Sequence, residues 1–358
     1  MKARKDSIVE NTNVNSIDEL ITPINLKNQL PLDEKTKDRI CIWRSEIEDI
    51  IAGKDNRYLV VIGPCSIHDP VSAIEYANKI KDFQNQFSES IFIVMRVYFE
   101  KPRTTIGWKG LINDPNLNGS YDINLGLKRA RDLLLKINQM GIPTGCEFLD
   151  VFTPQYYADL VSWGAIGART TESQLHRELA SGLSMSIGFK NGTDGSIDIA
   201  TDAIQCAESP HVFLGIDEYG KASIIKTKGN QALHIILRGG AKGSNFDHVS
   251  ISNINKLLKS KNINKRILID CSHGNSGKNY KNQPLVLESV MNQIENGEKN
   301  ICGFMIESNI KEGMQKHNIE NGTCGLEYGK SITDACINLD TSLKMLERIV
   351  SLKFNYFT

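Results

Sequence analysis

Residues 58–70 read Y-L-V-V-I-G-P-C-S-I-H-D-P. The first half of this stretch is a continuous apolar run of strand length, and Asp69-Pro70 at its end has the composition of a helix start. A run that is apolar throughout, without polar alternation, indicates a strand buried on both faces, as in a parallel sheet. The stretch therefore predicts a buried strand that leads directly into a helix.

The same pattern recurs seven more times along the chain. Further apolar runs of strand length lie at 91–97, 143–149, 165–169, 185–190, 234–238, 266–270 and 301–306. Segments with helical periodicity lie between most of them, at 70–84, 122–140, 154–163, 172–181 and 280–296. Eight strand–helix units predict an α/β fold closed into a (β/α)8 TIM barrel rather than an open doubly wound sheet.

Two segments fall outside this repeat. Residues 1–57 begin as a polar stretch and continue as an amphipathic helix from Asp33 to about Ala52, which predicts an N-terminal extension that serves oligomerisation or regulation. Residues 58–358 are expected to form the barrel itself. Residues 211–227 read as two strands around a Tyr-Gly turn, which predicts a β-hairpin inserted between the fifth and sixth barrel strands.

Composition excludes several classes of partner. The 358 residues contain 42 basic and 42 acidic side chains, so the net charge is zero and neither nucleic acid nor an anionic membrane is an expected partner. No apolar run is long enough to span a bilayer. The 8 cysteines form no C-x-x-C pair, which indicates a reduced, cytoplasmic chain without disulfides.

Side chains that can bind ligands or take part in catalysis lie at the ends of the predicted strands. They are Cys65, Arg96, Glu147, Arg169, Lys190, Arg238, Asp270 with His273, and Glu307. Active sites of (β/α)8 barrels lie at the carboxyl ends of the strands and draw on several of them. The pattern therefore predicts cations, a thiol, an imidazole and carboxylates around one opening.

The cations predict anionic substrates. They are Arg96, Lys101, Arg103, Arg169, Lys190 and Arg238. Arginine binds phosphate and carboxylate oxygens in pairs, and lysine adds a point charge. Six cations exceed the need of one phosphate and suit two phosphorylated substrates, one of them also a carboxylate. The alternative is six ordinary surface cations in a chain that contains 42.

The thiol, imidazole and carboxylates predict a metal site. Cys65, His273, Glu307 and one further carboxylate form a mixed set of ligands that suits Mn, Fe, Co or Zn better than Mg or Ca. Taken alone, Cys65 is better interpreted as a small buried hydrophobe, because free cysteine is among the most buried residue types. His68, three residues later, is interpreted as a structural residue at the start of the next helix.

Long motifs give the chain a resemblance to a known family. They are G-P-C-S-I-H-D-P (63–70), M-R-V-Y-F-E-K-P-R-T-T-I-G-W-K-G (95–110), G-A-R-T-T-E-S-Q (167–174), G-F-K-N-G-T-D-G (188–195), I-L-R-G-G (236–240), D-C-S-H-G-N-S (270–276), M-I-E-S-N (305–309) and Y-G-K-S-I-T-D-A-C (328–336). From about residue 20 to its C-terminus the chain resembles the type I, microbial class of 3-deoxy-7-phosphoheptulonate synthases. This resemblance implies condensation of phosphoenolpyruvate with erythrose 4-phosphate, the first step of the shikimate pathway.

The resemblance also implies roles for single residues. One divalent metal ion would be bound by Cys65, His273, Glu307 and Asp334. Phosphoenolpyruvate would be bound by Arg96, Lys101, Arg169, Lys190, Arg238 and the backbone of Ala168, and the phosphate of erythrose 4-phosphate by Arg103 and Thr104. Cys65, His273, Glu147 and Lys101 would be the catalytic group. Lys101 would be the general acid, and burial among arginines is expected to lower its pKa.

In the resembling family, a feedback site for an aromatic amino acid accompanies the barrel. Here that site would comprise Asp150, Pro154, Gln155, Leu183, Ser184, Phe213, Gly215 and Ile225. Gly215 stands where phenylalanine-responsive members tend to carry serine, which favours tyrosine as the effector. Alternatively, Gly215 only eases a tight hairpin. The family also implies a homodimer or homotetramer.

Three other functions remain open from the sequence. The related 3-deoxy-octulosonate 8-phosphate synthases share the fold and reaction type but lack the long K-P-R-T-T-I-G-W-K-G match. A Schiff-base aldolase would use Lys101 or Lys190 and need no metal. A non-catalytic sensor of phosphorylated metabolites would keep the cations without turnover. Residues 315–330 carry no pattern that predicts their conformation.

Overall fold

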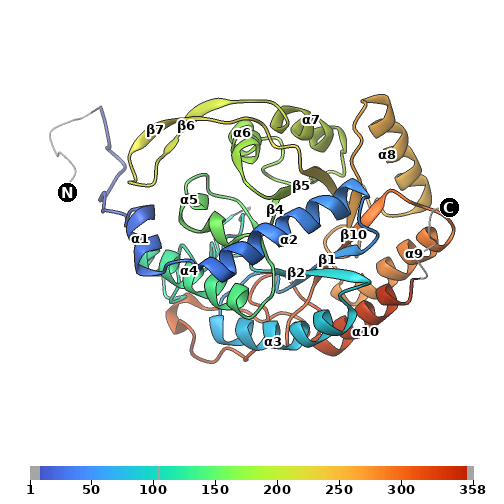
Figure 1. The fold of residues 1–358 in the computed structure, drawn as a ribbon. Coiled ribbons are helices and arrows are strands. Elements are labelled where there is room, and N and C mark those ends of the chain that lie inside the picture. The colour runs from blue at the N-terminus through green and yellow to red at the C-terminus, as the bar shows by residue number, and fades with distance from the viewer. Residues whose placement is uncertain (1–8, 104, 353–358) are drawn as a thin grey trace.

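The computed structural model describes residues 9–103 and 105–352. It confirms the predicted architecture, because eight parallel strands close into a barrel in the order β1-β10-β9-β8-β5-β4-β3-β2 (Figure 1). The barrel strands are β1 (Tyr58–Gly63), β2 (Ile91–Arg96), β3 (Thr144–Glu147), β4 (Trp163–Ile166), β5 (Ser186–Lys190), β8 (Leu233–Leu237), β9 (Ile267–Asp270) and β10 (Ile301–Glu307).

Helices connect these strands and surround them. The α-helices are α1 (Pro23–Gln29), α2 (Glu34–Ala52), α3 (Pro70–Phe87), α4 (Ile123–Gln139), α5 (Pro154–Tyr157), α6 (Gln174–Gly182), α7 (Asp198–Ala207), α8 (His248–Ser260), α9 (Gln283–Glu295) and α10 (Leu339–Val350). Three short 3-10 turns are η1 (Ala158–Leu160), η2 (Tyr280–Asn282) and η3 (Ile319–Asn321). Within the described ranges, none of these helices has the length and apolar character that crossing a bilayer requires.

The sequence explains the start of the first barrel helix. Asp69 adopts an extended conformation, and its carboxylate accepts hydrogen bonds from the backbone N–H groups of Val71 and Ser72. These are donors that a helix leaves unpaired in its first turn. Pro70 occupies the first helical position, where its missing N–H costs nothing. Asp69-Pro70 therefore turns the chain from β1 into α3, and His68, next to it, is buried as a structural residue should be.

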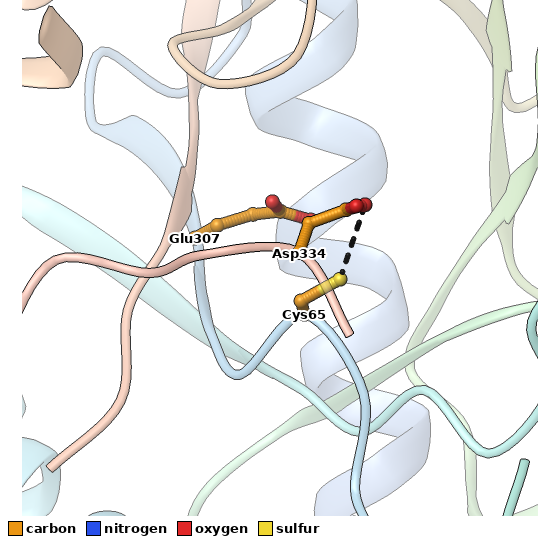
Figure 2. A group of neighbouring side chains, drawn as sticks. All are labelled: Cys65, Glu307 and Asp334. Carbon is orange, nitrogen blue, oxygen red and sulfur yellow. Dashed lines mark hydrogen bonds between the residues drawn. The ribbon is translucent and has the colours of Figure 1, made fainter. Parts of the chain in front are cut away.

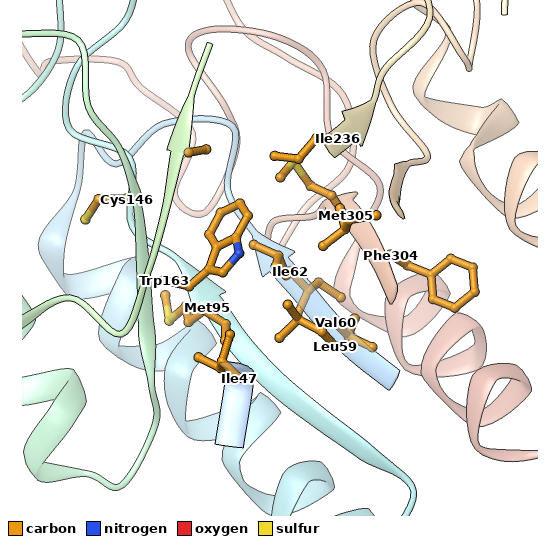
Figure 3. Packing of buried hydrophobic residues seen from close by; sticks show 14 of the residues in the cluster. Ile47, Leu59, Val60, Ile62, Met95, Cys146, Trp163, Ile236, Phe304 and Met305 are labelled. Carbon is orange, nitrogen blue, oxygen red and sulfur yellow. The ribbon is translucent and has the colours of Figure 1, made fainter. Parts of the chain in front are cut away.

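The core is made by the strands themselves. All six residues of β2 and all seven of β10 are buried, as continuous apolar runs predict. Trp163 of β4 is the largest fully buried side chain of the described residues, and Figure 3 shows it within the same cluster as Ile62 and Met95. Gly145 makes room for it, because a Cβ atom there would lie 3.1 Å from the Trp163 ring.

Most boundaries of the predicted strands and helices shift by a few residues, and two of the differences bear on the site or on an element's length. The fourth strand spans Trp163–Ile166 instead of 165–169, so Arg169 lies in the turn beyond the strand. The helix predicted over 154–163 is wrong in length, since α5 ends at Tyr157 and continues only as the short turn η1. The apolar residues at the end of the predicted helix instead lead into β4, because Val161 is extended and Trp163 is already in the strand.

The extension and the hairpin are both present. Strands β6 (Val212–Ile216) and β7 (Ala222–Lys226) pair antiparallel between β5 and β8 in the chain, as predicted. Helix α2 contacts β1 and β5, which lie on opposite sides of the barrel, and Arg44 of α2 donates to Val161 O, just before β4. Helix α2 therefore covers the amino ends of the strands and leaves the carboxyl ends free.

Candidate active site

A cavity of about 620 Å³ opens at the carboxyl ends of the barrel strands. The predicted site residues that line it are Lys101, Arg103, Glu147, Ala168, Arg169, Lys190, Arg238, His273, Glu307 and Asp334. Cys65 and Arg96 are not on its wall, because both are completely buried directly behind it. Thr104, predicted to bind a phosphate, lies outside the described residues.

Three of the four predicted metal ligands lie together. Ligand atoms of Cys65, Glu307 and Asp334 are all within 4.8 Å of one another, and Figure 2 shows the three side chains converging from β10 and two loops. Cys65 Sγ donates to Asp334 Oδ2 over 3.5 Å. Burial, together with the negative charges of Glu307 and Asp334, raises the pKa of the Cys65 thiol to about 11. A divalent cation would relieve this crowding of anionic groups, so the donor set fits a metal.

His273 stands at the edge of this group. Its Nε2 lies 3.6 Å from Glu307 Oε1, and its Nδ1 lies 2.8 Å from Asp270 Oδ2. Such a carboxylate behind an imidazole orients the second ring nitrogen toward a metal. Burial opposes ionisation of Asp270, but the attraction of His273, helped by Lys190 and Arg96, holds the pKa of its carboxyl below the usual value. His273 adopts a left-handed backbone conformation with φ of 53°, which is uncommon for histidine.

Glu307 lies with the predicted metal ligands and also contacts one of the cations. Its Oε1 accepts a hydrogen bond from Arg96 Nη2 over 2.9 Å, and its Oε2 accepts one from Ser272 Oγ over 3.0 Å. Both partners of the Arg96–Glu307 ion pair are almost completely buried. Burial alone would raise the pKa of Glu307, but His273, Arg96 and Lys101 lower it to about 2. The carboxylate is therefore ionised throughout the neutral range.

Lys101 is in direct contact with a predicted metal ligand. Its Nζ donates to Cys65 Sγ over 3.1 Å and to Cys65 O over 3.2 Å. The expected lowering of its pKa is wrong. Burial does act in that direction, but the Cys65 sulfur, which accepts a hydrogen bond from the amine, and the carboxylates of Glu307, Asp334 and Glu147 outweigh it and raise the pKa of Lys101 above the usual value. Lys101 is therefore an ammonium group that donates hydrogen bonds, and its raised pKa makes it a weaker acid than an ordinary lysine.

A second buried ion pair lies across the cavity. Lys190 Nζ donates to Glu147 Oε2 over 2.8 Å, and both side chains are about nine-tenths buried. Burial opposes the charge on Glu147, but Lys190 and Lys101 outweigh it and lower the pKa of Glu147 to about 2. The carboxylate thus fixes the position of Lys190 without neutralising the cavity as a whole, because Arg169 and Arg238 line the same wall.

Sequence reasoning did not single out a buried network of Asn191, Asn245 and Asn275. Asn191 Oδ1 accepts from Arg238 N over 2.8 Å and from Asn245 Nδ2 over 3.1 Å. Asn245 N donates to Asn275 Oδ1 over 2.9 Å, and Asn275 Nδ2 donates to Asp270 O over 2.9 Å. The network therefore ties together the ends of β5, β8 and β9, which carry Lys190, Arg238 and the Asp270–His273 pair.

Glu100, which precedes Lys101, is a buried carboxyl group whose pKa is raised, whereas that of Glu147 is lowered. Thr153 Oγ1 and Tyr157 Oη donate to its Oε2 over 3.1 and 3.4 Å, yet no cation compensates its burial among the described contacts. Burial and the nearby charge of Asp150 raise the pKa of Glu100 to about 8. The folded state therefore binds a proton at neutral pH that the unfolded chain releases.

Glu100→Gln is expected to raise the midpoint temperature of thermal unfolding. The difference from wild type should grow as the pH rises from about 5 to about 8. The ordinary pKa of 4.5 applies to the unfolded chain, so stability that protonated Glu100 contributes at low pH is lost as the pH rises toward 8. Glutamine does not ionise and escapes this loss, a gain of a few kcal/mol at most. Thermal unfolding followed by circular dichroism across this range measures it, and curves that stay parallel to wild type would contradict the expectation.

A second cavity, of about 190 Å³, lies between the hairpin and helices α5 and α6. It is lined by seven residues of the predicted effector set: Pro154, Gln155, Leu183, Ser184, Phe213, Gly215 and Ile225. Asp150 is not on its wall. Its Oδ1 instead accepts from the N–H groups of Phe152 and Thr153, just before α5. At Gly215 a Cβ atom would approach Ile225 Cγ1 to 2.7 Å, so a larger residue there would displace the Ile225 side chain on the opposite strand of the hairpin.

Comparison with known proteins identifies close relatives. Residues 23–347 match the family model described as the DAHP synthetase I family. The Tyr-sensitive phospho-2-dehydro-3-deoxyheptonate aldolase of Escherichia coli K12 is 50% identical over 348 residues, which cover 97% of this chain and 96% of the relative. The phenylalanine-inhibited phospho-2-dehydro-3-deoxyheptonate aldolase of Saccharomyces cerevisiae is 48% identical over 343 residues, covering 95% and 92%.

A solved structure agrees with this result. The phospho-2-dehydro-3-deoxyheptonate aldolase of Francisella tularensis SCHU S4 superposes with a TM-score of 0.92 at 50% sequence identity. The match covers 95% of this chain and 98% of that one. The barrel, the extension and the inserted hairpin therefore belong to one shared fold.

Proposed function

The chain belongs to the DAHP synthetase I family, and from this we infer that it condenses phosphoenolpyruvate with erythrose 4-phosphate. The products are 3-deoxy-D-arabino-heptulosonate 7-phosphate and phosphate, in the first step of aromatic amino acid biosynthesis. The cavity at the carboxyl ends of the barrel strands is the proposed active site. One observation carries this assignment: Glu307 and Asp334, which lie together with buried Cys65, line a cavity that is also lined by Lys101, Arg169, Lys190 and Arg238.

Phosphoenolpyruvate is the substrate that these cations suit best. Its phosphate and carboxylate carry up to three negative charges, and Arg169, Lys190 and Arg238 line the cavity from three different strand ends. Arg96 Nη1 has no hydrogen-bond partner among the described residues, so it keeps a donor for an incoming anion. We place the phosphate of erythrose 4-phosphate near Arg103, whose Nε donates to Trp108 O over 2.7 Å. Thr104 is proposed for the same phosphate from the sequence.

The proposed metal site consists of Cys65, Glu307 and Asp334, with His273 as the fourth ligand. Sulfur, nitrogen and carboxylate oxygen together suit Mn, Fe, Co or Zn. When bound, such an ion would polarise the aldehyde oxygen of erythrose 4-phosphate as a Lewis acid. The neighbouring Ser272 and Asp270 hold Glu307 and His273 in place through the contacts described above.

The reaction joins C3 of phosphoenolpyruvate to the aldehyde carbon, water adds to C2, and the C2–O bond to phosphate breaks. Lys101 is proposed to donate its proton to the aldehyde oxygen as that oxygen becomes a strongly basic alkoxide, because its ammonium group lies 3.1 Å from the Cys65 sulfur of the proposed metal site. Glu147 is ionised and holds Lys190 beside the reacting carbons. Fixing both substrates among these groups supplies several kcal/mol of the barrier through orientation.

An assay with phosphoenolpyruvate and either erythrose 4-phosphate or arabinose 5-phosphate tests this function. Turnover is expected with erythrose 4-phosphate, and it should stop after exhaustive chelation and return with a divalent metal. Preference for arabinose 5-phosphate would favour the octulosonate reaction instead. Turnover that survives chelation, with a substrate adduct trapped by borohydride on Lys101 or Lys190, would favour a Schiff-base aldolase.

The second cavity is the proposed feedback site, and tyrosine is the proposed effector. Named relatives include Tyr-sensitive and phenylalanine-inhibited enzymes, so an aromatic amino acid suits the family. Phe213 and Ile225 supply apolar walls, and Gln155 and Ser184 supply polar groups. Because Gly215 has no side chain, Ile225 can pack against it and form this wall of the cavity. Stronger inhibition by phenylalanine than by tyrosine would refute the choice.

Gly215→Ser is expected to weaken inhibition by tyrosine by roughly tenfold or more, since a new side chain 2.7 Å from Ile225 must displace one wall of the cavity. Inhibition curves for tyrosine and phenylalanine on both proteins measure this change. Activity without effector should stay unchanged, because the hairpin does not line the catalytic cavity. An unaltered tyrosine curve would remove Gly215 from the effector site.

The role of the N-terminal extension is also a proposal. Residues 1–57 are assigned to regulation and assembly, because Ile24 N donates to Glu218 O at the hairpin tip and Tyr156 Oη donates to Ile21 O. The extension thus contacts both β6-β7 and α5, the elements around the second cavity. A homodimer or homotetramer in the cytoplasm is the expected assembly, which sedimentation of the purified protein tests.

A further inference from the structure

Tyr98 lies two residues beyond β2, and its ring contacts two cations of the catalytic cavity. The guanidinium carbon of Arg96 lies 4.1 Å from the ring centroid, and Lys190 Nζ lies 5.8 Å from it. The ring is almost completely buried. Arg96 ends β2 and Lys190 ends β5, so one aromatic ring joins side chains from distant parts of the barrel.

Arg96 has few other means of offsetting its burial. It is completely buried, with Nη2 bonded to Glu307 Oε1 and Nε donating to Pro64 O over a long 3.4 Å. Nη1 has no partner in the part of the chain that the structure describes. A cation in this position is stabilised by the negative face of an aromatic ring, and the attraction is strongest where water is excluded.

The ring of Tyr98, rather than its hydroxyl, makes these contacts. Among the described residues the hydroxyl has no hydrogen-bond partner, although it is buried. Burial also raises the pKa of Tyr98 well above its usual value, so the hydroxyl stays protonated. A buried hydroxyl without a partner contributes no stability, and its removal should cost nothing.

We propose that Tyr98 is a positioning residue, whose ring holds Arg96 and Lys190 at the spacing that binds phosphoenolpyruvate. The inference rests on the proposed substrate. Each cation has its own carboxylate, Glu307 for Arg96 and Glu147 for Lys190, and the ring is the element common to both ion pairs. Four strand ends, those of β2, β3, β5 and β10, are thereby linked around one ring.

Tyr98→Phe and Tyr98→Leu separate the ring from the hydroxyl. Binding of phosphoenolpyruvate to the metal-loaded protein, measured by calorimetry without erythrose 4-phosphate, should change by less than about twofold in the phenylalanine variant. In the leucine variant it should weaken by about 10- to 30-fold, as expected for loss of the ring from two cations. KM for phosphoenolpyruvate should rise in parallel, while KM for erythrose 4-phosphate stays near the wild-type value.

Phe304→Leu is the matched control for loss of a buried ring. Phe304 of β10 is buried against Tyr58 at a ring separation of 6.1 Å, and the described structure gives it no cation contact. This variant should lose stability but keep its affinity for phosphoenolpyruvate. If Tyr98→Leu does not fold, fluorinated phenylalanines at position 98 keep the ring volume and weaken its negative face, so affinity should fall stepwise with fluorine content.

Three results would overturn the inference: wild-type affinity in Tyr98→Leu, an equal loss in Tyr98→Phe, or an equal loss in Phe304→Leu. Unchanged affinity across the fluorinated series would do the same. Failure of the proposed function looks different, because the wild-type protein itself would then not bind phosphoenolpyruvate.

Discussion

Glu307→Gln is expected to abolish turnover and to destabilise the protein at the same time. The substitution removes the charge that pairs with buried Arg96 and contributes to the Cys65–Glu307–Asp334 group. Loss of several kcal/mol of transition-state stabilisation corresponds to a fall in kcat on the order of a thousandfold or more. Arg96 would then be buried without its carboxylate, which should lower the free energy of unfolding by about 3–5 kcal/mol. Steady-state kinetics, metal content and thermal unfolding measure the three effects.

The matched control is Glu288→Gln. Glu288 also pairs with an arginine, Arg348, at 2.9 Å, but both side chains are partly exposed on α9 and α10. Exposed ion pairs contribute about 0–1 kcal/mol, so this variant should keep its activity and nearly all its stability. A Glu307→Gln protein that retained bound metal and wild-type turnover would remove Glu307 from the site.

Lys190→Met is expected to weaken binding of phosphoenolpyruvate by about 10- to 100-fold, because one charge-assisted contact to the substrate is lost. It should also destabilise the fold by about 3–5 kcal/mol, since Glu147 loses the cation that pairs with it inside the barrel. With Lys190 gone, the pKa of Glu147 should rise from its low value of about 2, so Glu147 is protonated at higher pH and the loss of stability relative to wild type should shrink as the pH falls. Calorimetry and acid titration of unfolding measure both effects.

The double variant Lys190→Met/Glu147→Gln separates structure from function. Both charges are then absent, so stability should return to within about 1–2 kcal/mol of wild type, whereas substrate affinity should not recover. Recovery of affinity together with stability would mean that Lys190 only neutralises Glu147 and does not bind substrate.

The barrel could be predicted from the sequence because its strands carry a strong local signal. Apolar runs such as 91–97 and 301–306 are buried on both faces and need no knowledge of their neighbours to be recognised. The helix predicted over 154–163 was wrong because the same apolar residues serve a short turn and then β4. Periodicity cannot separate these two cases over so few residues.

The site residues that lie at strand ends could be predicted from the sequence. Those whose role depends on contacts between distant segments could not. Cys65, Glu147, Lys190 and Glu307 follow from their place at the ends of apolar runs. Asp334 lies in a loop far beyond β10, and only the family resemblance pointed to it. The pKa of Lys101 was predicted with the wrong sign, because no sequence pattern indicated how many carboxylates and thiols would face its amine.

The central claim is that strand ends far apart in the sequence bind one divalent ion beside the phosphoenolpyruvate site, and titration with Co²⁺ tests it most directly. We predict one Co²⁺ per chain, with a near-ultraviolet sulfur-to-cobalt charge-transfer band that disappears in Cys65→Ser. Failure to bind Co²⁺ stoichiometrically, or the same band in Cys65→Ser, would contradict the account.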